Sequence, residues 1–135
     1  MRLVPLLSLL AVLGLAVPLA AHHSLGRYDQ TTLVPITGVV SKVQWINPHA
    51  WITLTVKNSD GKVVDQDIEL ASPIGLMNKG FDMKLVKIGD TITLESWLSK
   101  PEFINAPAGR TLILPDGRRF DVADNFDQLG KVRTK

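Results

Sequence analysis

The chain has 135 residues, which suits one domain and is short for two. It contains no cysteine, so a disulfide framework and a lipid-modified cysteine are both excluded. Arg2 is one of 15 basic residues, and the rest of the chain therefore carries 14 basic against 13 acidic residues. This near-neutral balance gives no general attraction to nucleic acid or to anionic lipid, and we expect no nucleic-acid partner.

The first 21 residues have the pattern of an export signal. One positive charge at Arg2 precedes an uncharged apolar run, and small residues end the run at Ala20 and Ala21. We expect residues 1–21 to be a signal peptide that is cleaved near Ala21, leaving no stable membrane anchor. An uncleaved anchor is the structural alternative, because nothing from Leu3 to Ala21 is charged.

Residues 22–35 show no strong periodicity, and we expect them to form an N-terminal arm. Short alternating segments follow, which is typical of β-strands. Residues 36–46 are the first expected strand, in which Gly38 marks a bulge or a bend. The second strand covers residues 49–57, where apolar and polar side chains alternate cleanly.

A turn signal at residues 58–61 separates the second strand from a third strand over residues 62–70. A short helix is expected next, because Ser72 suits a helix cap, Pro73 its first position and Gly80 its end. We expect two residues of this helix to pack against the domain, Leu76 and Met77.

Further strands are expected over residues 87–98 and 110–114, with a short sixth strand over residues 119–122. One helix between the third and fourth strands is the order of an OB-type barrel. The sequence therefore predicts a mainly β fold, a small OB-like barrel of five to six strands over residues 36–123. Residues 124–135 are polar and are expected to form a loose tail.

The three histidines lie in two short stretches, "AHHS" with His22 and His23, and "NPHAW" with His49. Cleavage after Ala21 would place His22 at the N-terminus, where its free amine and ring nitrogen chelate one metal ion. The imidazole of His49 would complete three nitrogen ligands, an arrangement called a histidine brace. Such a nitrogen set favours Cu(II), and copper is therefore the expected metal.

Cleavage after Ala20 would instead leave Ala21, His22 and His23 as the first three residues. The Ala21 amine, two backbone amides and the His23 ring would then form a nitrogen set that also favours Cu(II) or Ni(II). The expected metal ligands are therefore His22, His23 and His49.

A purely structural interpretation competes with the metal site. His22 and His23 would then form a tail, and His49 would cap a turn after Asn-Pro through a backbone hydrogen bond. Against this interpretation, Trp51 shares a strand face with His49 and would give it a rigid aromatic wall.

Three other residues are expected to line a ligand site. Glu69 lies nearest the helix start and would serve as an acceptor, either beside the copper ligands or at the helix N-terminus. It shares a strand face with Asp65 and Asp67, for which a solvated surface is favoured over a hard-cation site. Trp45 and Trp51 would complete the lining, although core or rim packing is favoured for aromatic side chains.

The residues after the leader resemble a family of small secreted bacterial proteins, domain-of-unknown-function family 6152. The matching pieces cover almost the whole mature chain: "AHHSLGRYD", "ITGVVSKVQWINPHAWITLTV", "IELASPIGLMNKGF", "KIGDTITL" and "LILPDGRRF". The resemblance implies a periplasmic, single-domain, OB-like barrel. The chain departs from the family pattern at Ile74 and Phe81, which puts a ligand contact from the helix side in doubt.

We therefore expect a periplasmic metal-binding protein for Cu(II), serving storage, delivery or tolerance. The alternative is a metal-free OB-fold module that binds a small molecule or an envelope protein partner. A copper oxidase on the same ligands is a third interpretation. Binding is favoured over catalysis, because nothing in the sequence marks a substrate cleft.

Overall fold

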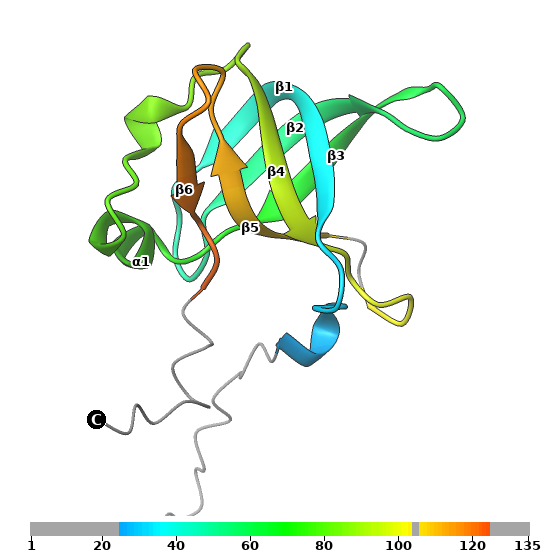
Figure 1. Cartoon of the computed structure of the whole chain (residues 1–135), viewed down its shortest axis with the longest axis horizontal. Coiled ribbons are helices and arrows are strands. Elements are labelled where there is room, and N and C mark those ends of the chain that lie inside the picture. Colours follow the sequence, from blue (N-terminus) through cyan, green and yellow to red (C-terminus); the bar gives the residue numbers. More distant parts are fainter. Residues whose placement is uncertain (1–24, 104–105, 125–135) are drawn as a thin grey trace, which may run out of the picture.

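A computed structural model describes residues 25–103 and 106–124 (Figure 1). The predicted signal peptide, His22, His23 and all of the predicted tail except Asp124 lie outside the described residues. Within the described ranges, no helix combines the length and the apolar character needed to cross a bilayer.

The described chain forms one six-stranded sheet in the order β3-β2-β1-β4-β5-β6. Its strands are β1 (Val34–Gln44), β2 (Trp51–Lys57), β3 (Val63–Glu69), β4 (Thr91–Trp97), β5 (Ala108–Ile113) and β6 (Arg119–Asp121). All neighbouring strands in this order pair antiparallel.

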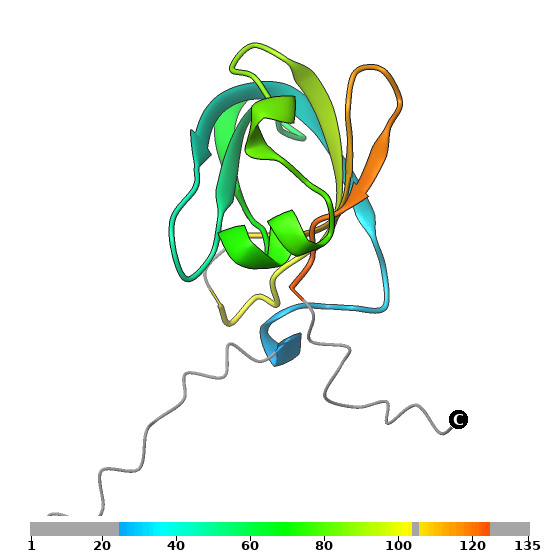
Figure 2. The same ribbon diagram turned by 90° about the vertical axis from the view of Figure 1, so that its left-hand side faces the viewer.

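A further pairing closes the sheet on itself. β5 lies parallel to β3 through Glu69 and Ala108, so the first five strands form a ring (Figure 2). The α-helix α1 (Pro73–Asn78) connects β3 to β4 by way of the 3-10 turn η2 (Met83–Leu85). The predicted fold class, mainly β and OB-like with one short helix between the third and fourth strands, is confirmed.

β1 is long because it serves two neighbours in turn. Val34 to Val39 pair with β4, and Val39 to Gln44 pair with β2. Gly38 lies beside this change of partner, where a Cβ atom would come within 2.6 Å of the Thr55 carbonyl oxygen. The sequence predicted a bulge or a bend at Gly38, and the register shift falls just after it, between Val40 and Lys42.

α1 begins and ends at the residues that the sequence indicated. The Ser72 side chain accepts a hydrogen bond from the backbone N–H of Gly75, and Gly80 adopts a positive φ of 78° just after the helix. Leu76 is fully buried, but Met77 is 52% exposed, so its predicted packing role is wrong. A helix of six residues turns only one narrow face inward, and the residue after Leu76 points about 100° away from it.

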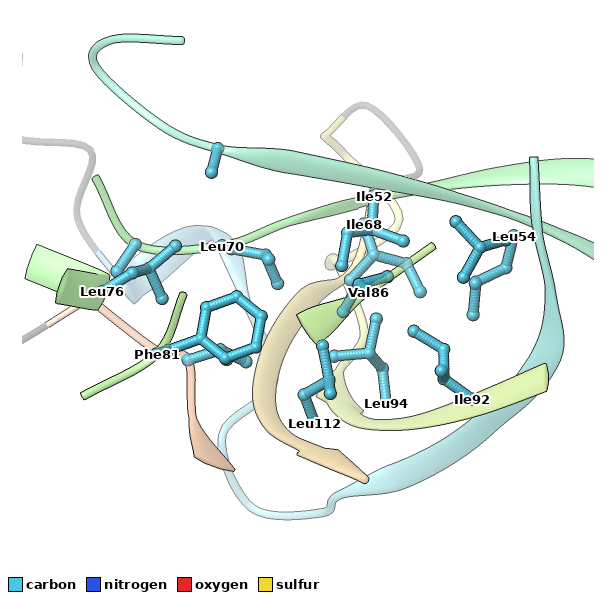
Figure 3. Close-up of a cluster of buried hydrophobic side chains, with 14 of the residues drawn as sticks. Ile52, Leu54, Ile68, Leu70, Leu76, Phe81, Val86, Ile92, Leu94 and Leu112 are labelled. Carbon is cyan, nitrogen blue, oxygen red and sulfur yellow. The ribbon is translucent and has the colours of Figure 1, made fainter. Parts of the chain in front are cut away.

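The interior of the ring is filled by aliphatic side chains from the facing strands and from the segment around α1 (Figure 3). Ile52, Leu54 and Ile68 reach it from β2 and β3, as the alternation in the second strand predicts. Phe81, which follows α1, is 1% exposed and meets the Phe120 ring edge-on at 5.4 Å. The helix segment therefore closes one end of the ring, as Figure 2 shows.

Candidate functional site

His49 lies in the connection between β1 and β2, directly after a cis Asn47–Pro48 peptide bond. It is 9% exposed. Its Nδ1 atom lies 3.1 Å from the carbonyl oxygen of Leu70, at the end of β3. Because a carbonyl oxygen only accepts, Nδ1 donates in this bond, and the ring tautomer that it selects has its lone pair on Nε2.

Glu69 is the next polar group around His49. It ends β3, it is 8% exposed, and its Oε1 atom lies 3.5 Å from His49 Nδ1. Its Oε2 atom accepts a hydrogen bond of 2.7 Å from the Tyr28 hydroxyl. The Arg27 guanidinium lies 3.8 Å from the same oxygen. A buried carboxylate thus has a hydroxyl donor and a nearby positive charge, as burial of a charge requires.

Tyr28 fastens the described part of the N-terminal arm to the ring. It forms an isolated bridge with Ser99, and the adjoining backbone hydrogen bonds are Asp29 N–H to Leu98 O and Lys100 N–H to Arg27 O, both 2.9 Å. Burial, together with the hydrogen bond to Glu69 and the negative charge of that residue, raises the pKa of Tyr28 well above its usual range. The hydroxyl therefore stays protonated and remains a donor to Glu69.

The sequence interpretation did not single out Arg27 or Tyr28. Tyr28 is the chain's only tyrosine, and it directly follows the cation Arg27 in the arm. The Arg27 guanidinium carbon lies 5.5 Å from the centre of the Tyr28 ring. The available signal was an Arg-Tyr pair in an arm without periodicity. The partner of Tyr28, Glu69, lies 41 residues further along the chain, so no local pattern in the sequence indicated their contact.

Arg27, His49 and Glu69 line a cavity of about 280 Å³. Asn47 completes its polar lining, and Ile46, Pro48 and Trp51 supply much of its apolar wall. The arm, the β1–β2 connection and the end of β3 therefore meet at one site.

The structure brings three of the expected site residues together, namely His49, Trp51 and Glu69. Trp45 lines a different cavity, together with Met77, Phe81 and Met83. Side chains alternate along an extended chain, but the turn at Pro48 breaks the alternation between Trp45 and Trp51.

Asp65 and Asp67 are exposed on β3, as predicted, whereas Glu69 of the same strand is buried. Asp65 accepts a hydrogen bond from the Thr55 hydroxyl, and Asp67 accepts one from the Thr53 hydroxyl. The two aspartates therefore belong to cross-strand pairs with β2.

In the part of the chain that the structure describes, no three His, Cys, Asp or Glu side chains are arranged to hold a metal ion. Two carboxylates lie near His49, with Asp124 Oδ2 at 3.6 Å from Nδ1. Both lie on the Nδ1 side of the ring, the side on which outer partners of a metal-bound histidine are found when Nε2 is the ligand. Of the three histidines named as candidate ligands, His49 is the one within the described residues.

The fold and the cavity define a small OB-like β domain with one buried, oriented histidine beside a cavity that its N-terminal arm also lines. The chain belongs to the family of unknown function DUF6152, whose model matches residues 10–102. No curated protein and no solved structure gives a significant match to the chain.

Proposed function

We propose that this is a periplasmic Cu(II)-binding protein in which His49 and the N-terminal residue left by signal cleavage hold the metal. Copper storage, delivery or tolerance are the roles that such a site would serve. The single observation that supports the proposal is the hydrogen bond from His49 Nδ1 to the Leu70 carbonyl, because a histidine that donates from Nδ1 would bind a metal through Nε2.

The position of the arm supports the same proposal. Arg27 lines the cavity that His49 lines, and His22 precedes Arg27 by five residues. Leu25–Arg27 form a 3-10 turn, so three residues separate the start of this turn from His22, a span of at most about 10 Å when extended. The proposal requires the amino end released at His22 to reach the cavity across this span.

The proposed ligands are the His22 amine, the His22 ring and His49 Nε2. Three nitrogen donors with no thiol suit Cu(II), which also heads the affinity order of the divalent first-row metals. If cleavage falls one residue earlier, Ala21, His22 and His23 form the copper site at the terminus, and His49 takes no part.

The test uses protein exported to the periplasm with only a C-terminal tag. The mass of the mature chain identifies its first residue, and Cu(II) titration with electron paramagnetic resonance reports the ligand set. We expect a His22 start, one Cu(II) per chain, and at least a tenfold loss of affinity with a changed spectrum in His49→Ala.

His23→Ala is the matched control, because it alters the neighbouring imidazole and leaves the proposed ligands in place. Two results would overturn the proposal: a chain that begins elsewhere and takes up no copper, or a His49→Ala protein that binds copper with an unchanged spectrum. An Ala21 start, with binding abolished by His23→Ala alone, would assign the copper to the terminal tripeptide.

A second candidate is a metal-free periplasmic module that binds a small molecule or an envelope protein partner at the same cavity. The observation that favours it is the lining, in which Arg27, His49 and Glu69 converge against an apolar wall that includes Trp51. Its volume of about 280 Å³ is close to the lower end of the range for small-ligand pockets. A small molecule that binds the metal-free protein and does not compete with Cu(II) would favour this candidate.

A further inference from the structure

A second cavity, of about 620 Å³, lies beside α1 and η2. It shares no lining residue with the His49 cavity. Its apolar lining consists of Phe81, which is buried, Trp45 and Met83, which are half-buried, and Met77, which is 52% exposed. An apolar group that filled it would remove these side chains from water, so the cavity favours an apolar occupant.

The last described residues of the chain are fastened to the segment around α1 (Figure 2). The Val122 carbonyl accepts a hydrogen bond of 2.9 Å from the Ala71 backbone N–H, and the Ala123 carbonyl accepts one from Lys79 Nζ. Lys79 follows α1, and the next residue, Gly80, lines the cavity. Val122 and Ala123 are both buried, so Lys79 joins a fixed point of the chain to the edge of the cavity.

Residues 125–135, "NFDQLGKVRTK", follow this fixed point. They are polar overall, but Phe126, Leu129 and Val132 are apolar and recur every third residue, as side chains on one face of a helical turn do. Phe126 lies three residues after Ala123 and Leu129 lies six after it, which allows extended spans of at most about 11 Å and about 22 Å. A segment with regularly spaced apolar side chains thus begins where the described chain is fastened.

We propose that residues 125–132 fold back over this cavity and fill it with the side chains of Phe126 and Leu129. The apolar surface that the segment and the lining both remove from water drives the contact. Aromatic rings also make favourable contacts with thioether sulfur, and Met77 and Met83 are the two thioethers of the lining. Only residues 133–135 would then stay loose, instead of the whole tail expected from its polar composition.

The charges at the cavity suit this segment. Asp82 and Lys84 are exposed and line the cavity, and neither belongs to an ion pair within the described ranges. The segment carries Asp127 and Lys131 among its apolar residues. Each charge of the lining therefore has an opposite charge in the segment, and such exposed pairs contribute little energy but favour one placement over others.

This inference does not rest on the proposed Cu(II) site, because it uses no residue of the His49 cavity. The two proposals can therefore fail separately. The same segment of a second copy of the chain is the other occupant that the lining would accept, and the experiment distinguishes the two.

The test uses the full mature chain, without a tag, and with 13C-labelled methionine methyl groups. The mature chain has two methionines, Met77 and Met83, so each methyl signal reports on the cavity. Because the chain has no cysteine, Gly130→Cys provides a single attachment site for a nitroxide spin label. We expect the label to broaden both methyl signals. Adding Phe126→Ser and Leu129→Ser should reduce the paramagnetic relaxation at least threefold, because the segment loses the side chains that fill the cavity.

Gln128→Ser is the matched control, because it introduces the same residue at a polar position of the segment, and it should leave the broadening unchanged. A label at Asp60→Cys, in the turn between β2 and β3, should broaden neither signal, since this turn and α1 lie on opposite sides of the molecule (Figure 1). In a mixture of spin-labelled chains without 13C and unlabelled chains with 13C, both signals should stay sharp, because the contact lies within one chain.

Three results would overturn the inference. One is a label at Gly130→Cys that leaves both methyl signals sharp, and another is broadening that persists unchanged with Phe126→Ser and Leu129→Ser. The third is broadening that appears in the mixed sample as strongly as in the uniform one, which would assign the cavity to the tail of a second copy.

Discussion

Glu69 is the residue on which the polar groups of the His49 cavity converge. Its carboxylate is buried, it accepts a hydrogen bond from Tyr28, and it lies within 3.5–3.8 Å of His49 and Arg27. A buried carboxylate without donors is costly, so the tyrosine hydroxyl both stabilises Glu69 and holds the arm at the cavity.

Replacing Tyr28 with phenylalanine removes this hydroxyl and keeps the ring. Because the Glu69 carboxylate would lose its shortest donor, we expect Tyr28→Phe to lower the free energy of unfolding by about 1–3 kcal/mol. Urea denaturation measures the change. Thr55→Val is the matched control, since it removes an exposed hydroxyl that donates to Asp65 at 2.7 Å, and it should cost much less. Equal losses in the two variants would contradict a special role for the buried pair.

The pH dependence of Tyr28→Phe provides a second check at the same residue. The pKa of Tyr28 is raised in the folded protein, so its stabilising effect is complete below the unfolded pKa of about 10 and is lost as pH rises beyond that value. The stability difference between wild type and Tyr28→Phe should therefore shrink between pH 9 and pH 11. A constant difference would contradict this assignment.

Strand alternation and helix periodicity predicted only part of the residues around the His49 cavity and on α1. His49, Trp51 and Glu69 line one cavity. The sequence paired His49 with Trp51 by strand alternation, and it placed Glu69 near them by its position before the helix. Tyr28 and Arg27 were missed because their roles depend on a carboxylate far along the chain. Met77 was assigned to packing because helix periodicity does not reveal how narrow the buried face of a six-residue helix is.

At the scale of elements, Asp121 joins the helix segment to the sheet. This residue of β6 forms ion pairs with Lys79, at the end of α1, and with Arg110 of β5. Burial alone would raise the pKa of Asp121, but hydrogen bonds from Arg110 and Lys79 outweigh it and hold the pKa below its usual value. Asp121 therefore links three elements around the closed end of the ring.

We expect Asp121→Asn to destabilise the protein by about 0.5–1 kcal/mol at pH 7, the upper part of the range for exposed ion pairs. Because the folded pKa is lowered, the contribution is present above the unfolded pKa of about 3.9 and is lost as pH falls through the folded value. Thermal unfolding at pH 7 and at decreasing acid pH measures the difference, which should decline below pH 4. Glu95→Gln, which removes the charge from the exposed pair with Arg119, should have a smaller effect at pH 7.

The elements themselves were largely predictable. Alternation, turn glycines and the Ser72-Pro73 cap indicate local structure, so each expected strand and the helix are present with small shifts at their ends. The position of the β1 bulge was not predictable, because it depends on which neighbour each half of β1 meets. The parallel pairing of Glu69 with Ala108 likewise joins residues 39 positions apart, which no local pattern encodes.

At the scale of the whole molecule, the ring, the fastened arm and the cavity form one unit. The arm is attached at Tyr28 by a β-bridge and by the hydrogen bond to Glu69. Glu69 is the last residue of β3, and the carbonyl of the next residue, Leu70, accepts the hydrogen bond from His49. A metal bound between the amino end and His49 would therefore tie the start of the mature chain to the ring, and its binding free energy would add to folding stability.

We accordingly expect Cu(II) to raise the thermal midpoint of the mature protein in a manner that depends on both pH and the N-terminus. Free imidazole titrates near 6.5 and an α-amine near 7.7–8.0, so protons displace the metal in mild acid, and the upward shift should be large at pH 8 and small at pH 5. A protein with an acetylated amino terminus at His22 is the matched control, because it keeps every side chain and removes the terminal amine from the chelate. Scanning calorimetry with and without one equivalent of Cu(II) makes the comparison. An equal shift in the acetylated protein would mean that the amine is not a ligand and that the metal binds elsewhere.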